Sequence, residues 1–85
     1  MISKLRGKIG EIDSQILKLL AKRMSVAKEI GKYKKKNKLK IVDNKREKKV
    51  FAEIKRKSRK LRLNTKFTKD IFNKIIKKSR RVQRR

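Results

Sequence analysis

Cysteine, histidine, proline and tryptophan are all missing from this 85-residue sequence, and two of these absences exclude whole classes of function. Without cysteine, the chain cannot form a disulfide framework, a thiolate metal site or a cysteine nucleophile. Without histidine, it lacks the most common general base and the most common metal ligand. We therefore expect no metal centre in this protein.

Acidic residues and long apolar runs are also scarce. No apolar run approaches the roughly 18 residues of a transmembrane span, and the N-terminus lacks the apolar core of a signal peptide. We expect a soluble, cytoplasmic protein.

Seven Asp and Glu stand against 32 Lys and Arg, which gives a formal net charge of +25. This charge favours an anionic partner, which by charge alone could be nucleic acid, a membrane surface or a small polyanion.

The stretch from Ile2 to about Lys36 has the pattern of one long amphipathic helix. Its apolar residues recur in alternating steps of three and four, at Ile2, Leu5, Ile9, Ile12, Ile16, Leu19, Val26, Ile30 and Tyr33. Arg23 interrupts this seam, and a guanidinium directed into a core needs an anionic partner. Gly10 lies one residue from the seam, which indicates a close approach of two helices.

The length of this helix predicts an oligomer. A helix of 35 residues is about 52 Å long, whereas a compact globule of this size is roughly 30 Å across. The rest of the chain is too short to cover the whole seam. We therefore expect another copy of the chain or a different protein to bury it, and an intertwined oligomer is the simplest arrangement.

A second helix is predicted to begin at Asp43 or Asn44. Asn44 and Glu47 have the spacing of a capping box. An apolar stripe follows at Val50, Phe51 and Ile54. Glu47 precedes these residues by three, four and seven positions, so it points to the same side as they do. This spacing places a carboxylate on the inward face.

A third helix is predicted from Asn64 or Thr65 to about Gln83. Its apolar face consists of Ile71, Phe72, Ile75 and Ile76. The same spacing then reaches Ser79, Val82 and Gln83, so the inward face becomes polar near its end. Residues 80–85 are interpreted as a frayed basic tail. The chain is thus expected to be one all-α domain, residues 1–85, with one long helix and two shorter ones.

Four blocks of the sequence carry a resemblance to a known family. They are LRGKIGEID (Leu5 to Asp13), ILKLLAKRMSVAKEIGKYK (Ile16 to Lys34), IVDNKRE (Ile41 to Glu47) and IFNKIIKKSRRVQ (Ile71 to Gln83). In order and spacing they resemble the all-helical class of chorismate mutase, and they cover nearly the whole chain. The resemblance implies an intertwined helical homodimer of three-helix chains, a dianionic substrate, chorismate, and a reaction without a cofactor.

The resemblance also implies which residues bind the substrate. Arg6 is expected to reach into the pocket of the partner subunit and bind one carboxylate of chorismate. Arg23 is expected to bind the other carboxylate, assisted by Ser79. Asp43 and Arg46 are expected to line the site nearby.

Three further residues are implied as catalytic. Lys34 and Gln83 are expected to donate hydrogen bonds to the ether oxygen of the breaking bond, and Glu47 to hold the ring hydroxyl. The rearrangement of chorismate to prephenate is unimolecular and pericyclic, so it needs no nucleophile, metal or obligatory proton transfer. Catalysis then depends on a compact reactive conformer and on cations placed where negative charge develops. The absence of cysteine and histidine is compatible with this chemistry.

The sequence departs from the family pattern at two neighbouring positions. Lys40 stands where members often have proline, and Val42 stands where some have an arginine that helps to bind a substrate carboxylate.

The main alternative function is a basic helical protein that binds nucleic acid without enzymatic activity, although the scarcity of aromatic residues favours non-specific binding at most. A third possibility is a helical interaction module, or a mutase fold that has lost its activity.

Overall fold

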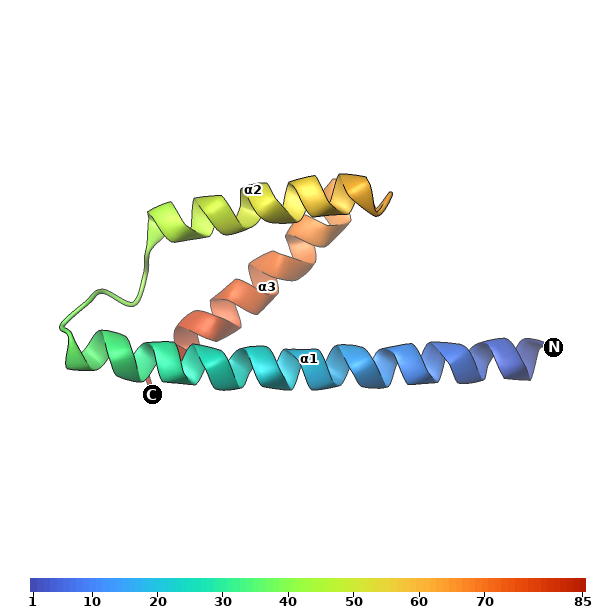
Figure 1. Ribbon diagram of the computed structural model, residues 1–85, viewed down its shortest axis with the longest axis horizontal. Coiled ribbons are helices and arrows are strands. Elements are labelled where there is room, and N and C mark those ends of the chain that lie inside the picture. The colour runs from blue at the N-terminus through green and yellow to red at the C-terminus, as the bar shows by residue number, and fades with distance from the viewer.

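The computed structural model describes residues 1–85 and contains three helices and no strands (Figure 1). Helix α1 spans Ile2–Lys36, α2 spans Asn44–Lys60 and α3 spans Thr65–Gln83. The expected all-α class, with one long helix and two shorter ones, is confirmed. None of the three helices contains an apolar stretch of the length that a membrane span needs.

The ends of α1 and α2 are closed by the same backbone arrangement. After α1, the Lys38 amide donates to the Lys35 carbonyl and the Leu39 amide to the Lys34 carbonyl, at 3.3 and 2.8 Å. This is a Schellman motif, which requires positive φ at the residue after the cap, and Lys38 has φ 55°. Arg62, with φ 58°, occupies the equivalent position after α2. Both turns are therefore formed without the glycine that usually occupies this position.

Side-chain caps fix the beginnings of α2 and α3. The Asp43 carboxylate accepts a hydrogen bond of 3.0 Å from the Arg46 amide, and the Asn64 side chain accepts one of 2.9 Å from the Phe67 amide. The expected capping box at Asn44 is wrong, because Asn44 is already the first residue of the helix. Asp43 has the extended backbone of an N-cap, and its negative charge is favoured at a helix N-terminus.

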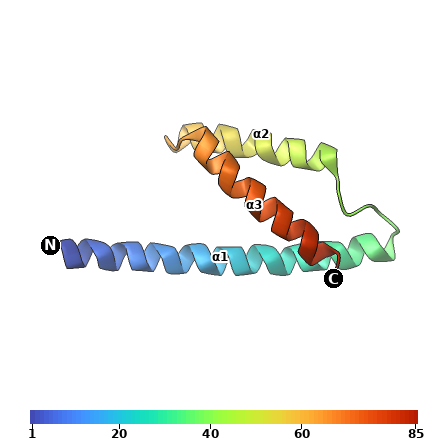
Figure 2. The same ribbon diagram turned by 180° about the vertical axis from the view of Figure 1, so that it is seen from behind.

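Helix α3 connects the other two helices. It packs on both α1 and α2, whereas α1 and α2 do not pack on each other. Figures 1 and 2 show α3 running diagonally from the end of α2 to the C-terminal half of α1, while the N-terminal part of α1 continues beyond both. The chain is accordingly elongated, with extents of 55 × 24 × 15 Å.

The close approach of α1 and α3 occurs at Gly31. A Cβ atom at this position would lie 2.5 Å from the Gln83 carbonyl oxygen and 2.6 Å from its Cα, so only glycine fits without a shift of backbone. At Gly10, the position suggested by the sequence, nothing lies within 4 Å of a Cβ in this chain. The close helix approach within one chain is therefore at Gly31.

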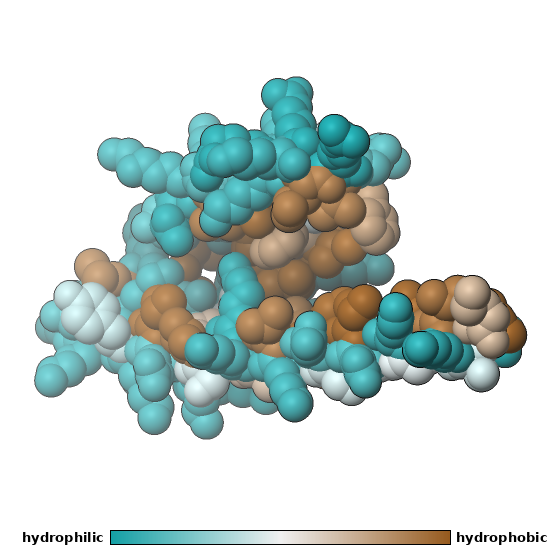
Figure 3. Space-filling model, turned by 45° about the vertical axis from the view of Figure 1, so that its right-hand side comes forward, coloured by the Kyte–Doolittle hydropathy of each residue, from teal (hydrophilic) through white to brown (hydrophobic).

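One chain buries very little apolar surface. Ala27 and Ile76 are the only buried hydrophobic residues, and the buried contact between α2 and α3 includes a hydrogen bond of 2.7 Å between the Ser58 and Thr68 hydroxyls. The seam of α1 stays open, with Ile2 at 60%, Ile9 at 58% and Ile16 at 50% exposure. Figure 3 shows this apolar band along α1, on the side that faces the other helices.

The end of α3 differs from the sequence expectation. The helix continues to Gln83, and Arg80 is half-buried and paired with Glu47 on α2. Arg80 is therefore no part of a frayed tail, and only Arg84 and Arg85 lie beyond the helix.

Candidate active site

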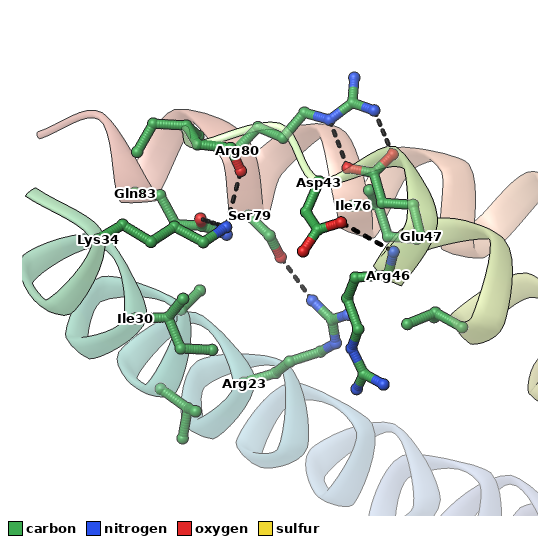
Figure 4. Close-up of a pocket in the computed structure, with 14 residues that line it drawn as sticks. Arg23, Ile30, Lys34, Asp43, Arg46, Glu47, Ile76, Ser79, Arg80 and Gln83 are labelled. Carbon is green, nitrogen blue, oxygen red and sulfur yellow. Dashed lines mark hydrogen bonds and ion pairs between the residues drawn. The ribbon is translucent and has the colours of Figure 1, made fainter. Parts of the chain in front are cut away.

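A pocket of about 400 Å³ lies between the C-terminal half of α1, the beginning of α2 and the end of α3. It brings together seven of the eight residues singled out in the sequence: Arg23, Lys34, Asp43, Arg46, Glu47, Ser79 and Gln83 (Figure 4). Its apolar lining consists of Val26, Ala27, Ile30, Ile41, Val50 and Ile76. The remaining lining residue, Arg80, was not expected there.

Lys34 and Gln83 meet at one end of the pocket. The Lys34 ammonium donates a hydrogen bond of 2.9 Å to the Gln83 amide oxygen and one of 2.7 Å to the Ile41 carbonyl. Because Lys34 holds the amide oxygen, the Gln83 nitrogen is left as a donor for a ligand. An ammonium and an amide donor thus lie side by side, in an arrangement suited to an oxygen that becomes negative.

Arg23 occupies another part of the pocket, eleven residues before Lys34 and therefore on the same side of α1. Its guanidinium donates to the Ser79 hydroxyl, which in turn donates to the Ile75 carbonyl at 3.0 Å. Partial burial, together with the nearby Arg46 guanidinium, lowers the pKa of Arg23 below its usual value. Arg23 therefore has a hydroxyl partner and a cationic neighbour but no carboxylate, as expected for a group awaiting an anion.

The beginning of α2 supplies two groups of opposite charge. Asp43 uses one carboxylate oxygen as the N-cap, so its position is fixed by the helix it begins. Arg46, one turn later, points its guanidinium toward the same region as Arg23, as Figure 4 shows. Two guanidinium groups from different helices thus flank one part of the pocket.

Glu47 and Arg80 form an ion pair across α2 and α3. Arg80 Nε donates to one Glu47 oxygen at 2.8 Å, and the terminal guanidinium nitrogen donates to the other oxygen. This pairing raises the pKa of Arg80 above its usual value, first through the hydrogen bond from its guanidinium to Glu47. The helical period could have indicated Arg80, because Arg80 lies four residues after buried Ile76 and three before Gln83.

Arg6 is the one predicted site residue that the structure does not bring to this pocket. It is exposed near the start of α1, seventeen residues before Arg23, or about 25 Å along the helix axis. A small ligand cannot bridge that distance within one chain.

The charges around the pocket do not balance. The lining contains four cations, Arg23, Lys34, Arg46 and Arg80, and two carboxylates, Asp43 and Glu47, which leaves two positive charges. The pocket is also walled by apolar side chains, which strengthen electrostatic interactions by reducing the local dielectric. The arrangement therefore fits a compact dianion with a hydrophobic body.

The chain is similar to proteins of one known family. A family model described as chorismate mutase type II matches residues 5–84. A protein named chorismate mutase from Methanocaldococcus jannaschii is 42% identical over 53 residues, which cover 62% of this chain and 54% of that protein. The matched region thus spans about half the length of this curated relative. No solved structure shows a significant match to the chain.

Proposed function

The chain belongs to the chorismate mutase type II family, and on that basis we propose that it converts chorismate to prephenate. The observation that carries this proposal is the pocket with two surplus positive charges and a paired ammonium and amide donor at one end. Chorismate offers the matching groups, which are two carboxylates, a ring hydroxyl and an ether oxygen.

The reaction breaks the ether C–O bond and forms a C–C bond within the same molecule. No atom enters or leaves, so the protein has two tasks: to hold the compact conformer in which the reacting carbons meet, and to stabilise negative charge on the ether oxygen. The apolar side chains that line the pocket, among them Ile30 and Ile76, would restrict the substrate to this conformer.

In this proposal, Lys34 and Gln83 act on the ether oxygen. The Lys34 ammonium turns from the Gln83 amide oxygen to the substrate, and the amide nitrogen donates beside it. Because this oxygen gains charge only as the bond breaks, the interaction is stronger in the transition state than in the bound substrate. Lys34 is therefore the residue whose loss should reduce kcat most.

Arg23, with Ser79, would bind one carboxylate, and Arg46 and Asp43 line the same region. Glu47 would accept a hydrogen bond from the ring hydroxyl. A guanidinium binds a carboxylate through two parallel hydrogen bonds, which fixes orientation as well as position. The second carboxylate would be bound by Arg6 of a second chain, because Arg6 is too distant to serve the pocket of its own chain.

A homodimer is part of the proposal, and surface area supports it. One chain exposes 7872 Å², whereas a compact monomer of this mass exposes about 5,300 Å². A dimer that buried this excess surface area on both chains would bury about 5,000 Å² in total, which is near the upper end of the range for obligate interfaces. The open seam of α1 is the natural contact, because its apolar residues have no other cover.

The activity is tested by following the loss of chorismate absorbance with purified protein. We expect measurable turnover that falls by about 10²- to 10³-fold in kcat for Lys34→Ala, the range for losing a group that stabilises developing charge. Lys35→Ala is the matched control, because Lys35 is exposed on the same helix and does not line the pocket. Full activity of Lys34→Ala would refute the assigned site.

The alternative function, nucleic-acid binding, explains the net charge of +25. It gives no role to the Lys34–Gln83 and Arg23–Ser79 contacts, which lie inside the pocket. Salt-sensitive binding to duplex DNA without any mutase activity would favour this alternative over the proposed one.

A further inference from the structure

Arg80 is the one charged pocket residue that was not expected from the sequence, and the proposed reaction assigns it no task. It lies on α3 between Ser79 and Gln83, and its side chain reaches across to Glu47 on α2. Both partners are largely shielded, with side-chain exposures of 31% for Arg80 and 20% for Glu47. A partly buried, two-pronged ion pair at the edge of a reaction pocket calls for a functional explanation.

The geometry of the pair fixes the carboxylate of Glu47. Both of its oxygens accept from a single guanidinium, one from Nε and the other from a terminal nitrogen (Figure 4). Such a bidentate pair, called the fork below, sets the plane of the carboxylate as well as its position. Each carboxylate oxygen has a second lone pair, so Glu47 can still accept one hydrogen bond from a ligand hydroxyl.

Without this fork, Glu47 would have another partner available. Arg46, the adjacent residue on α2, directs its guanidinium toward the region of Arg23, so this part of the pocket holds two cations that could attract the carboxylate. Arg23, on the opposite helix, lines the same pocket and has no carboxylate partner of its own. Because opposite charges attract strongly in a partly apolar cavity, a free Glu47 would be drawn toward Arg23.

We propose that Arg80 is a positioning residue that holds the Glu47 carboxylate on its own side of the pocket and so keeps Arg23 free to bind a substrate carboxylate. This inference rests on the proposed mutase function and adds a residue to it. The Arg80–Glu47 pair is neutral as a unit, so the surplus charge of the pocket comes from Arg23, Lys34 and Arg46 against Asp43. Arg80 does not touch the substrate; it acts through Glu47.

The first test is a double-mutant cycle in the mutase assay. Arg80→Met removes the fork and keeps much of the side-chain length. We expect kcat/KM to fall about tenfold to a hundredfold, the range for losing a charged hydrogen bond, with most of the change in KM because Arg23 is then neutralised. In a Glu47→Gln background the same substitution should change kcat/KM by less than about threefold, since a neutral amide cannot neutralise Arg23.

Other roles of Arg80 predict different outcomes. If Arg80 bound the substrate directly, or served only to pack α3, its loss would be equally harmful with Gln at position 47, and the proposal would be overturned. Arg80→Lys keeps a charge but loses the fork, so its KM should lie between those of the wild type and Arg80→Met. This variant also replaces Arg80→Met in the test if Arg80→Met does not fold. Arg81→Met is the matched control, because Arg81 is exposed on the same turn and lies outside the pocket.

The second test does not depend on activity. In ¹⁵N-labelled free protein, Arg80→Met should shift the Arg23 Nε–H signal, because Glu47 becomes its partner, and Arg81→Met should leave that signal in place. An unchanged Arg23 signal would overturn the proposal even if the enzyme is active. An inactive wild-type protein that shows the shift would instead refute the mutase function and leave the charge separation by Arg80 established.

Discussion

Arg23 occupies a position where the seam of α1 would otherwise carry an apolar side chain. Its guanidinium is partly buried beside a second cation and has only the Ser79 hydroxyl as a partner. Such an arrangement costs stability in the free protein, because burial removes water and no carboxylate replaces it. The proposed binding of an anion therefore gives Arg23 a role that its contribution to folding does not.

The Arg23→Met variant should separate these two effects. Methionine restores an apolar side chain of similar length, so we expect the free energy of unfolding to rise by about 1 kcal/mol and the melting temperature by roughly 4–8 °C. Chorismate binding should weaken strongly, seen as a large increase in KM. Lys22→Met, at the exposed neighbouring position, should change neither quantity by much. A lower melting temperature for Arg23→Met would contradict this account.

At the residue scale, the pocket composition was largely predictable from the sequence. Arg23, Glu47 and Gln83 stand out because each puts a polar group on a face that is otherwise apolar. Arg80 was missed because, in a chain with 32 Lys and Arg, its place on the inward face of α3 was not distinguished from the other basic residues near the terminus. Its pairing with Glu47 depends on how α2 and α3 pack, and no spacing within one helix contains that information.

At the element scale, the crossing of α1 and α3 sets the distance between Lys34 and Gln83, the two groups proposed to act on the ether oxygen. Gly31 lies against the backbone of Gln83, and three residues further along α1 is Lys34, which bonds to the Gln83 side chain. The absence of a side chain at Gly31 thus lets the two helices approach closely enough for Lys34 and Gln83 to meet.

Gly31→Ala should disturb both packing and catalysis. A Cβ would lie 2.5 Å from the Gln83 carbonyl oxygen, so the backbone of α3 must shift. We expect a loss of about 1–3 kcal/mol in stability, typical of overpacking, and a lower kcat because Gln83 moves from Lys34. Gly7→Ala is the control: nothing lies within 4 Å of its Cβ, so better helix propensity should stabilise the chain by up to about 1 kcal/mol. Equal effects of the two substitutions would contradict this explanation.

The bounds of α1 and α3 and the beginning of α2 were predicted to within a residue or so, because they follow from hydrophobic periodicity and from cap residues. The details that failed depend on three-dimensional context. Asp43 and Asn44 are both good caps by type, and only the path of the preceding loop makes Asp43 the cap. Likewise, α3 approaches α1 at Gly31 and not at Gly10, and a single amphipathic pattern does not reveal where another helix crosses.

At the scale of the whole molecule, the net charge of +25 acts against a compact state. Only Glu47 and Glu53 form ion pairs with basic side chains, so most of the Lys and Arg have no acidic partner within the chain. Mutual repulsion among exposed charges is screened as the Debye length falls from about 30 Å at 0.01 M salt to about 10 Å at 0.1 M.

We therefore expect the melting temperature to increase with sodium chloride concentration across this range, measured by circular dichroism. A neutral osmolyte at matched osmolarity is the control, because it does not screen charge. A melting temperature that is unchanged across ionic strength would show that self-repulsion does not limit stability.

The active site as proposed requires two chains, and complementation between variants tests this directly. Arg6→Ala removes a group that serves the partner's pocket, and Lys34→Ala removes one that serves its own. In a mixed dimer the pocket that keeps Lys34 also receives an intact Arg6, whereas the other pocket lacks both. Random reassociation of equal amounts after unfolding should therefore restore about a quarter of wild-type activity, because half of the dimers are mixed and each has one complete site.

The matched control is a mixture of Lys34→Ala and Gln83→Ala, refolded in the same way. Lys34 and Gln83 bond to each other within one chain, so every pocket of a mixed dimer still lacks one of them and no activity should return. Recovery in the first mixture but not in the second would require Arg6 to act across the interface. If neither mixture recovers activity and light scattering shows that the wild type is an active monomer, Arg6 has no part in catalysis. The seam of α1 must then be covered by another partner.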